Sequence, residues 1–453
     1  MELKGARVLV VGLARTGVAL ARFLSAQGAI VTATDAAPAE NLAEAIKALD
    51  GLPVTLELGV PQPAAVEAYD LILLSPGVPP ELPWLEAARR RGIPVVGELE
   101  LARPFLTLPI LAISGTNGKT TTTTLTAELL QAGGLRPLVG GNIGTPLISL
   151  VEEQSGHDLL VLEVSSFQLD TAPNFHAHRA ALLNITPDHL DRYPDYNAYV
   201  ASKAGLFRHQ TAADLRVLNF DDPGVRAMQE GPARVLFFST RQPLAAGAWL
   251  EGETLRVRLP GGPDAAFPLA DIRLSGRHNL ENVMAALLLA LDAGVAPAAC
   301  RDVLARFAGL PHRIQYVATI DGVEYYDDSK GTNVGAVIRA LEQFSRPVLL
   351  IAGGRDKDSD FSLLAPAIKA RVRHLVLLGE TKERLAKAWQ GLAPIHLVAD
   401  LAEAVRTCRR LARPGEVVLL SPACASFDMF RDYAHRGDTF QRLVREAAHG
   451  RGI

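Results

Sequence analysis

The 453-residue sequence contains few cysteines, no long apolar run and no large excess of charge of either sign. Its three cysteines, Cys300, Cys408 and Cys424, form no Cys-x-x-Cys pair. This spacing argues against a disulfide framework or a zinc site and fits a reducing cytoplasm. The apolar run over residues 8–13 is too short for a signal peptide or a membrane span, so we expect no membrane insertion. The formal net charge is −3, which gives no basic field for nucleic acid.

The most informative segment present is the glycine-rich stretch Gly115-Thr116-Asn117-Gly118-Lys119-Thr120-Thr121, which follows an apolar run and precedes a Thr/Leu/Ala-rich segment. A turn between a strand and a helix directs backbone N–H groups at one point, which suits a polyphosphate. Lys119 is predicted to reach the β- and γ-phosphates, and the Thr120 hydroxyl to bind Mg²⁺. Ile113 stands where the usual motif has its first glycine, so this is a shortened phosphate loop. We predict that the chain binds ATP or GTP.

The chain is too long for a single core, and 48% of its residues are hydrophobic. We therefore predict three domains, spanning residues 1–96, 97–308 and 309–453. Predicted strands and helices alternate in each third, and polar loops follow the strands, as in α/β folds. The predicted fold is α/β, with a Rossmann-like N-terminal domain, a central P-loop domain that binds ATP, and a Rossmann-like C-terminal domain.

The N-terminal third resembles half of a dinucleotide-binding fold. A predicted strand over residues 7–11 leads into a turn that starts at Gly12, and a second predicted strand ends at Asp35. The middle glycine of the usual fingerprint is Ala14, so the pattern indicates a nucleotide rather than NAD in particular. Ser75 and Gly77 follow another apolar run, at the position where open α/β sheets bind ligands. The alternative for this last segment is a simple Pro-Gly turn.

Candidate metal ligands and catalytic groups follow the phosphate loop. Glu163 lies in an otherwise apolar run, where a carboxylate is costly unless it is paired or bound to a cation, and such an acid commonly holds Mg²⁺ in P-loop proteins. His189 is a candidate metal ligand or general base, or only a loop histidine. The spacing around Lys203 by itself favours an exposed or snorkelling lysine over a functional one. Asn279 and Asn282 share a helix face that would hydrogen-bond a base, or cap and pack.

The last third carries cationic side chains at predicted strand ends. Residues 317–326 are predicted to form a hairpin that turns at Asp321-Gly322, and Lys330 follows it. Arg355 and Lys357 follow an apolar strand predicted over residues 347–352. These cations would lie at the ligand edge of an α/β sheet, which fits an anionic second substrate.

Taken together, the motifs resemble those of the Mur ligases, the ATP-dependent amide-forming enzymes of peptidoglycan precursor synthesis. The matching motifs occur in the order of the family and are Gly-Thr-Asn-Gly-Lys-Thr, Glu-Val-Ser-Ser-Phe-Gln, Asp-His-Leu-Asp, His-Asn-x-x-Asn, His-Arg and Asp-Ser-Lys-Gly-Thr-Asn. Two further motifs resemble those of the family branch that adds D-glutamate. They are Ser-Pro-Gly-Val-Pro and Leu-Ser-Pro-Ala-Cys-Ala-Ser-Phe-Asp. The resemblance implies that ATP phosphorylates the carboxylate of UDP-N-acetylmuramoyl-L-alanine, and that the amine of D-glutamate attacks the acyl phosphate.

The resemblance also implies roles for particular residues, with the UDP substrate, ATP and the amino acid bound by the first, second and third domains. The implied ATP contacts are Gly115, Thr116, Asn117, Gly118, Lys119, Thr120, Thr121, Asn279, Arg313 and Asp328. The implied contacts to the UDP substrate are Thr16, Asp35, Ser75, Gly77, Asn142, Gln168 and His189. The implied contacts to D-glutamate are Lys330, Thr332, Lys357, Ser426 and Tyr433. The implied catalytic residues are Lys119, Glu163, His189 and Lys203. The implied ligands of two Mg²⁺ ions are Thr120, Glu163, His189 and Lys203, the last as a carbamate formed with CO₂. We expect a cytoplasmic monomer.

The sequence departs from the family pattern at several of these positions. Ala36 and Ala37 follow Asp35, where family members often have a hydroxyl and an arginine. Contacts to the uracil or the diphosphate must therefore come from elsewhere. Gln315 stands where an acid commonly follows the His-Arg motif, and Tyr433 stands where the family often has phenylalanine.

Three alternatives stay open from the sequence. One is a sister ligase that adds another amino acid, although the Asp-Asn-Pro-Arg motif of the diaminopimelate-adding relatives is not found in the sequence. The second is an NAD-dependent dehydrogenase, against which Ala14 and the Lys119 loop count. The third is a non-catalytic binding subunit, against which the intact set of Lys119, Glu163, His189 and Lys203 counts.

Overall fold

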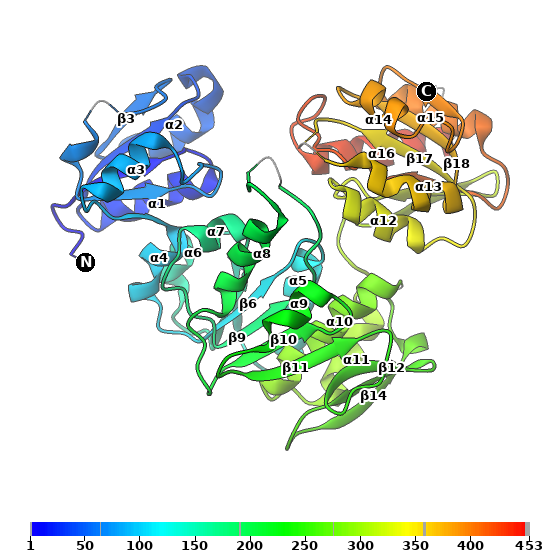
Figure 1. The fold of residues 1–453 in the computed structure, drawn as a ribbon, viewed down its shortest axis with the longest axis horizontal. Helices are drawn as coiled ribbons and strands as arrows, with labels where there is room; N and C mark the ends of the chain where they lie inside the picture. The colour runs from blue at the N-terminus through cyan, green and yellow to red at the C-terminus, as the bar shows by residue number, and fades with distance from the viewer. Residues whose placement is uncertain (1, 64, 190–191, 275, 357–358, 449–453) are drawn as a thin grey trace. The chain divides into compact units, whose positions relative to one another are not determined.

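The computed structural model describes residues 2–63, 65–189, 192–274, 276–356 and 359–448. The chain forms two compact units. The first unit lies within residues 1–185, 197–273 and 280–306, and the second within residues 186–196, 274–279 and 307–453. The described strands form three separate sheets (Figure 1), two in the first unit and one in the second.

The N-terminal sheet of the first unit is parallel throughout, with the strand order β3-β2-β1-β4-β5. Its strands are β1 (Arg7–Val11), β2 (Ile30–Asp35), β3 (Val54–Leu58), β4 (Leu71–Leu74) and β5 (Val95–Gly97), and its helices include α1 (Arg15–Ala26), α2 (Ala43–Leu49) and α3 (Pro83–Arg90). The strand order reverses between β1 and β4. In open α/β sheets the ligand crevice lies at such a reversal, beyond the carboxyl ends of the strands.

The central sheet of the first unit has nine strands in the order β14-β13-β12-β11-β10-β9-β6-β8-β7. The strands are β6 (Ile110–Ser114), β7 (Pro137–Gly141), β8 (Leu159–Glu163), β9 (Arg179–Leu182), β10 (Leu215–Asn219), β11 (Arg234–Ser239), β12 (Gly247–Glu251), β13 (Thr254–Arg258) and β14 (Asp264–Pro268). Strands β6 to β12 are parallel to one another, whereas β13 is antiparallel to both β12 and β14. Both β6 and β8 are buried along their whole length, as expected for strands covered on both faces.

The helices of this central region include the one that follows the phosphate loop. They are α4 (Glu98–Ala102), α5 (Lys119–Ala132), α6 (Leu147–Leu150), α7 (Ser166–Asp170), α8 (Tyr196–Ala204), α9 (Pro223–Arg226), α10 (Arg277–Asp292) and α11 (Pro297–Arg306). Helix α5 begins at Lys119, directly after the glycine-rich turn. The predicted strand–turn–helix arrangement of the phosphate loop is therefore confirmed.

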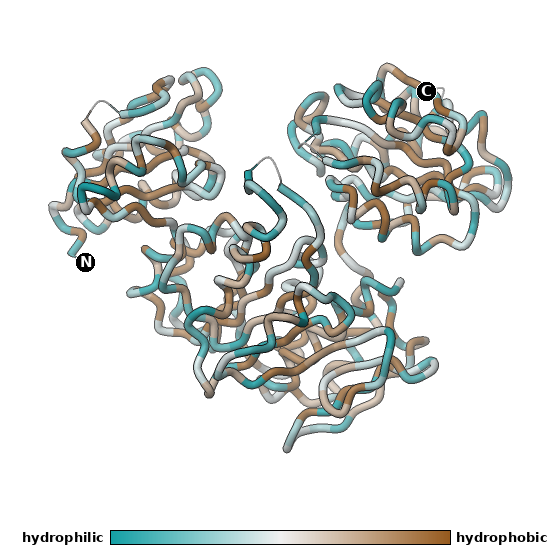
Figure 2. The backbone as a smooth tube through the Cα atoms, in the orientation of Figure 1, coloured by the Kyte–Doolittle hydropathy of each residue, from teal (hydrophilic) through white to brown (hydrophobic). Residues whose placement is uncertain are grey.

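The sheet of the second unit has the order β15-β16-β20-β17-β18-β19. Its strands are β15 (Gln315–Ile320), β16 (Val323–Asp327), β17 (Val348–Gly353), β18 (Val372–Leu378), β19 (Ile395–Leu397) and β20 (Val417–Leu420), and its helices include α12 (Val334–Glu342), α13 (Ala365–Arg371), α14 (Lys382–Ala388), α15 (Leu401–Leu411) and α16 (Tyr433–Ala448). All strand pairs are parallel except β15 with β16. The sheet has a hydrophobic core on each face, one under α12 to α14 and the other under α15 and α16, and Figure 2 shows the hydrophobic residues along its central strands.

The predicted α/β fold with three sheet-containing regions is confirmed. The predicted hairpin is also present, because β15 and β16 are antiparallel and Asp321 and Gly322 at its turn both have positive φ, 51° and 76°, as a two-residue hairpin turn requires. No sheet of the described residues crosses the predicted boundaries near residues 97 and 309, and the boundaries themselves stay a prediction. Within the described part of the chain, no helix is long and apolar enough to span a membrane.

Candidate functional site

The phosphate loop connects β6 to α5 and contains two glycines. Any other residue at these two positions would strain the backbone. Gly115 and Gly118 have φ values of +153° and +87°. A Cβ atom at Gly118 would lie 2.2 Å from the side-chain oxygen of Asn282. The loop therefore needs glycine at this position both for its backbone conformation and for the close approach of Asn282.

Asn184 holds the phosphate loop in place. Its Oδ1 accepts a hydrogen bond from the Asn117 amide at 2.9 Å, its Nδ2 donates to the Asn117 carbonyl at 3.0 Å, and its own carbonyl accepts from the Thr116 amide at 2.9 Å. The Thr116 hydroxyl also lies 3.1 Å from the Tyr199 hydroxyl. The sequence analysis missed Asn184. The available signal was a polar residue shortly after the apolar run that became β9.

Two lysines converge on the phosphate loop. Lys119 Nζ donates to the Gly115 and Thr116 carbonyls at 2.9 and 3.0 Å. Lys203 Nζ donates to the same Gly115 carbonyl at 3.1 Å and lies 4.8 Å from the centroid of the Tyr199 ring. Lys203 is only 1% exposed, so the alternative of an exposed lysine is wrong.

Glu163 ends β8 beside the loop that carries Asn142. Its Oε1 accepts a hydrogen bond from Asn142 Nδ2 at 2.7 Å, and its carbonyl accepts from the Asn142 amide at 2.8 Å. The carboxylate is buried, and its Oε2 has no hydrogen-bond partner among the described residues. A buried carboxylate oxygen without a partner is costly, and a bound cation would remove that cost.

Five of the residues predicted to contact the UDP substrate line one cavity of about 700 Å³, which we call the crevice cavity. They are Thr16, Asp35, Ser75, Gly77 and Asn142. The crevice cavity lies at the reversal of strand order between β1 and β4, and Asn142 comes from the loop after β7. The described lining does not include Gln168, whose side chain instead forms a capping box with Ser165 at the start of α7.

Asp35 and Ser75 also shape the turn after β1. The two Asp35 carboxylate oxygens accept from the Leu13 and Ala37 amides at 2.7 and 2.9 Å. The Ser75 hydroxyl donates to the Gly12 carbonyl at 2.7 Å. Both side chains thus hold backbone segments at the rim of the crevice cavity, in addition to any contact that they make with a ligand.

In the second unit, two adjacent carboxylates lie at the end of β16, Asp327 as its last residue and Asp328 directly after it. Asp327 Oδ2 accepts from His312 Nδ1 at 2.6 Å and from Gln441 Nε2 at 2.7 Å, and the Asp327 hydrogen bond raises the pKa of His312. Asp328 Oδ2 accepts from the Ser421 hydroxyl at 2.6 Å. Burial raises the pKa of Asp328 to about 7.

The residues predicted to contact D-glutamate lie on different strand-end loops of this sheet. Lys330 Nζ lies 3.6 Å from the centroid of the Tyr433 ring, which is a cation–π contact. Ser426 is buried and Thr332 is half-buried. The prediction for Lys357 lies outside the described residues.

Arg436 of α16 connects these loops, and the sequence analysis missed it. Its guanidinium donates to the Ser329 carbonyl at 2.9 Å, to the Ser329 hydroxyl at 3.0 Å and to the Cys424 carbonyl at 3.2 Å. The side chain is 2% exposed, and burial lowers the pKa of Arg436 to about 10. The sequence could have indicated this residue, because Arg436 is a charged residue among the buried positions of α16, next to Gly437 and one turn before Phe440.

The predicted metal ligands are divided between the two units, because Thr120, Glu163 and Lys203 belong to the first and His189 to the second. His189 has a positive φ of 55° and lies beside Asp188, which accepts a hydrogen bond from Asn333 Nδ2 at 2.9 Å. No group of three or more His, Cys, Asp and Glu side chains suited to a metal ion occurs among the described residues.

Two further predicted contacts to ATP, Asn279 and Arg313, also belong to the second unit. His278, directly before Asn279, accepts a hydrogen bond from Gln343 Nε2 at 3.1 Å. Burial, together with the charges of Arg339 and Arg313, lowers the pKa of His278 to about 3.

Comparison with known proteins gives matches along the whole chain. Residues 6–97 match the Mur ligase MurD-like N-terminal domain, residues 113–290 the Mur ligase middle domain, and residues 312–424 the Mur ligase glutamate ligase domain. The UDP-N-acetylmuramoylalanine–D-glutamate ligases of Geotalea uraniireducens and Koribacter versatilis are 48% and 44% identical to this chain. The first alignment covers 100% of both chains, and the second covers 99% of both.

Solved structures with the same fold are more distant in sequence. A pseudomurein peptide ligase type C from Methanothermus fervidus superposes with a TM-score of 0.63 at 17% identity, over 98% of this chain and 100% of that one. MurF ligase from Thermotoga maritima, solved in complex with ADP, superposes with a TM-score of 0.61 at 18% identity, over 99% and 96%.

Proposed function

The chain belongs to the Mur ligase family, and we propose that it uses ATP to join D-glutamate to UDP-N-acetylmuramoyl-L-alanine. The observation that carries the proposal is the 44–48% identity, along essentially the whole chain, to relatives that are named for this reaction. Specificity for the amino acid depends on side chains in several loops, so a match along all three family domains is stronger support than any one motif. We also propose that the protein acts as a cytoplasmic monomer.

The proposed chemistry solves a leaving-group problem. A carboxylate oxygen is a very poor leaving group, whereas phosphate is a good one. Phosphorylation of the L-alanyl carboxylate by ATP makes an acyl phosphate, which the amine of D-glutamate attacks. The tetrahedral intermediate then expels phosphate and leaves an amide. The enzyme must hold several anions together, which requires cations in fixed positions.

The phosphate loop is the proposed site of the ATP phosphates. Lys119 lies on the loop with its Nζ among the carbonyls of Gly115 and Thr116, within reach of phosphates bound at the N-terminus of α5. Its charge would offset the charge that develops on the transferred phosphoryl group.

The residues beside the loop fit Mg²⁺. Glu163 Oε2 is buried and without a hydrogen-bond partner among the described residues. A bound cation would give this carboxylate oxygen a partner. We propose that Thr120, Glu163, His189 and carbamylated Lys203 hold the metal. A carbamate at the buried Lys203 would be an anion in a site of low polarity, which is tolerable only beside a cation. Bound Mg²⁺ would neutralise charge on the phosphoryl group.

D-Glutamate is proposed to bind at the strand-end loops of the second unit. Lys330, Thr332, Lys357, Ser426 and Tyr433 are the proposed contacts. A dicarboxylate suits the cation of Lys330 and the hydroxyl of Ser426, because bonds between charged groups and carboxylates are the strongest polar contacts available. Arg436 would hold together the loops that follow β16 and β20, through Ser329 and Cys424.

The test is ADP formation with UDP-N-acetylmuramoyl-L-alanine and each of D-glutamate, L-glutamate and meso-diaminopimelate. Only D-glutamate should support turnover, and the product should contain a new amide. Turnover that prefers diaminopimelate would assign the chain to a sister ligase. ADP formation in none of the three mixtures would favour a non-catalytic relative.

A further inference from the structure

The crevice cavity contains little charge. Among the described residues that line it, Arg15 and Asp35 are the only charged ones. Both oxygens of the Asp35 carboxylate already accept backbone hydrogen bonds, from Leu13 and Ala37. Arg15 is therefore the cation that a negatively charged ligand would meet in this cavity.

We propose that Arg15 recognises the diphosphate of the UDP substrate, an inference that rests on the proposed function. A diphosphate needs cationic donors, and arginine matches the geometry of phosphate oxygens through its fork of N–H groups. The chain has Ala36 and Ala37 after Asp35, so neither of these side chains supplies a cation or a hydrogen-bond donor. Arg15, at the start of α1 after the neighbouring strand β1, would supply the cation that these two positions lack.

The position of Arg15 supports this assignment. It is the first residue of α1, a helix of 12 residues that has no side-chain cap and no acidic residue in its first turn. The partial positive charge of the helix N-terminus therefore adds to the charge of the guanidinium. Thr16, which also lines the crevice cavity, is the next residue of the same turn.

Arg15 also joins the two walls of the crevice cavity. Its Nη1 donates to the Gly144 carbonyl at 2.6 Å, on the loop after β7 that carries Asn142. A guanidinium has five N–H donors, so this bond occupies only part of the group. Asn142, on the same loop, donates a hydrogen bond to Glu163, a proposed metal ligand. Arg15 would therefore bind the diphosphate and also hold in place the loop that contacts Glu163.

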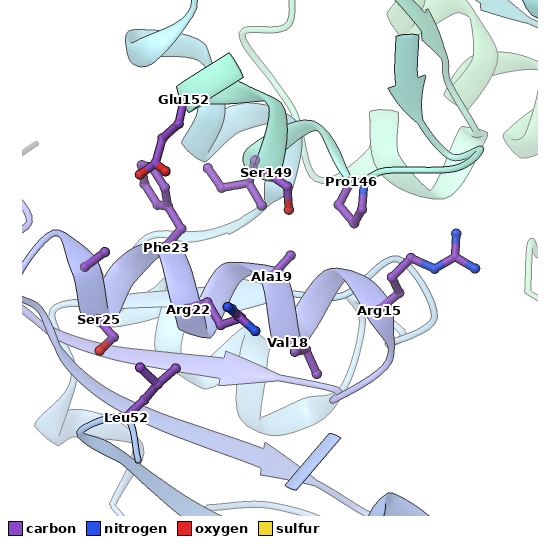
Figure 3. A pocket seen from close by; sticks show the side chains of 12 residues that line it. Arg15, Val18, Ala19, Arg22, Phe23, Ser25, Leu52, Pro146, Ser149 and Glu152 are labelled. Atoms are coloured by element: carbon purple, nitrogen blue, oxygen red, sulfur yellow. The ribbon is translucent and has the colours of Figure 1, made fainter. Parts of the chain in front are cut away.

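The competing explanation is that Arg15 only fastens α1 to the Gly144 loop. Arg22 provides a matched control, because it lies on the same helix and does not line the crevice cavity. Arg15 and Arg22 both line a separate groove of about 610 Å³ between α1 and α6 (Figure 3). In that view Arg15 stands at the N-terminal end of α1 beside Pro146, and Arg22 stands further along the helix.

The experiment measures the binding of UDP and of uridine by calorimetry to the full-length wild type and to the variants Arg15→Met, Arg15→Lys and Arg22→Met. Wild type should bind UDP about tenfold to a hundredfold more tightly than uridine. Arg15→Met should abolish most of that difference and leave uridine binding within about threefold of wild type. Arg15→Lys should be intermediate, and Arg22→Met should behave as wild type.

Three results would overturn the proposal. In the first, wild type binds UDP no more tightly than uridine. In the second, Arg15→Met weakens both ligands equally, which would assign the residue to fastening the two walls. In the third, UDP binding is unchanged in Arg15→Met, or in Arg15→Lys if the Met variant does not fold. Because no turnover is needed, these results are distinct from a failure of the D-glutamate assay.

Discussion

Replacing Glu98 by glutamine is expected to stabilise the first unit above pH 7 and to leave its stability nearly unchanged at pH 4. Glu98 begins α4 and is 2% exposed. Its Oε1 accepts a hydrogen bond from the Ile148 amide at 3.0 Å, and its Oε2 has no hydrogen-bond partner among the described residues. Burial raises the pKa of Glu98 from 4.5 to about 7.

The direction in which the free energy of unfolding changes with pH follows from proton binding at Glu98. Between pH 4.5 and 7 the folded state binds more protons at Glu98 than the unfolded state does, so the free energy of unfolding falls as the pH rises through this range. Above pH 7 the loss is complete and amounts to about 3 kcal/mol for the shift from 4.5 to about 7. Glutamine keeps the acceptor for Ile148 and cannot ionise, so it removes this loss.

Thermal unfolding of wild type and Glu98→Gln between pH 4 and pH 9 provides the measurement. The difference in melting temperature should grow from near zero at pH 4 to roughly 5–10 °C at pH 8. Glu152→Gln is the control, because Glu152 is an exposed carboxylate of the same unit, and its difference from wild type should not grow in this way. Parallel pH profiles for wild type and Glu98→Gln would refute the reasoning.

Further predictions concern the two proposed substrate sites. Lys119→Ala should lower D-glutamate-dependent ADP formation by at least about a hundredfold with an unchanged circular dichroism spectrum, and turnover within tenfold of wild type would contradict its role. Lys203→Ala should be nearly inactive and partly rescued by short carboxylic acids that replace the carbamate; full activity without any additive would remove Lys203 from the catalytic residues. Lys330→Ala should raise the KM for D-glutamate by about one to two orders of magnitude with little change in the KM for ATP, and an equal rise in both would argue against a specific site. Arg436→Lys should raise the KM for D-glutamate by about tenfold, because a single ammonium cannot replace both the Nε bond to the Ser329 hydroxyl and the Nη2 bond to the Cys424 carbonyl; an unchanged KM would show that the loops do not need this side chain.

Features that depend on neighbouring residues could be predicted from the amino-acid sequence. The glycines and Lys119 of the phosphate loop occur between an apolar run and a helix-forming segment, and such local order is readable without a structure. The hairpin at Asp321-Gly322 is another local feature, because both residues tolerate positive φ. The alternation of strands and helices likewise predicted the α/β fold and its polar strand-end loops.

Contacts between side chains that are distant in the sequence became visible in the folded chain. Arg15 and Gly144 are 129 positions apart and form a hydrogen bond, and Arg436 reaches a serine 107 positions away. Such pairs depend on the order in which parallel strands lie in a sheet, because crossover connections bring the carboxyl ends of non-consecutive strands to one edge. Strand order has no local sequence signal. Asn184, Arg15 and Arg436 therefore emerged from the folded structure. The same folding buried Lys203, although its local sequence favours an exposed residue.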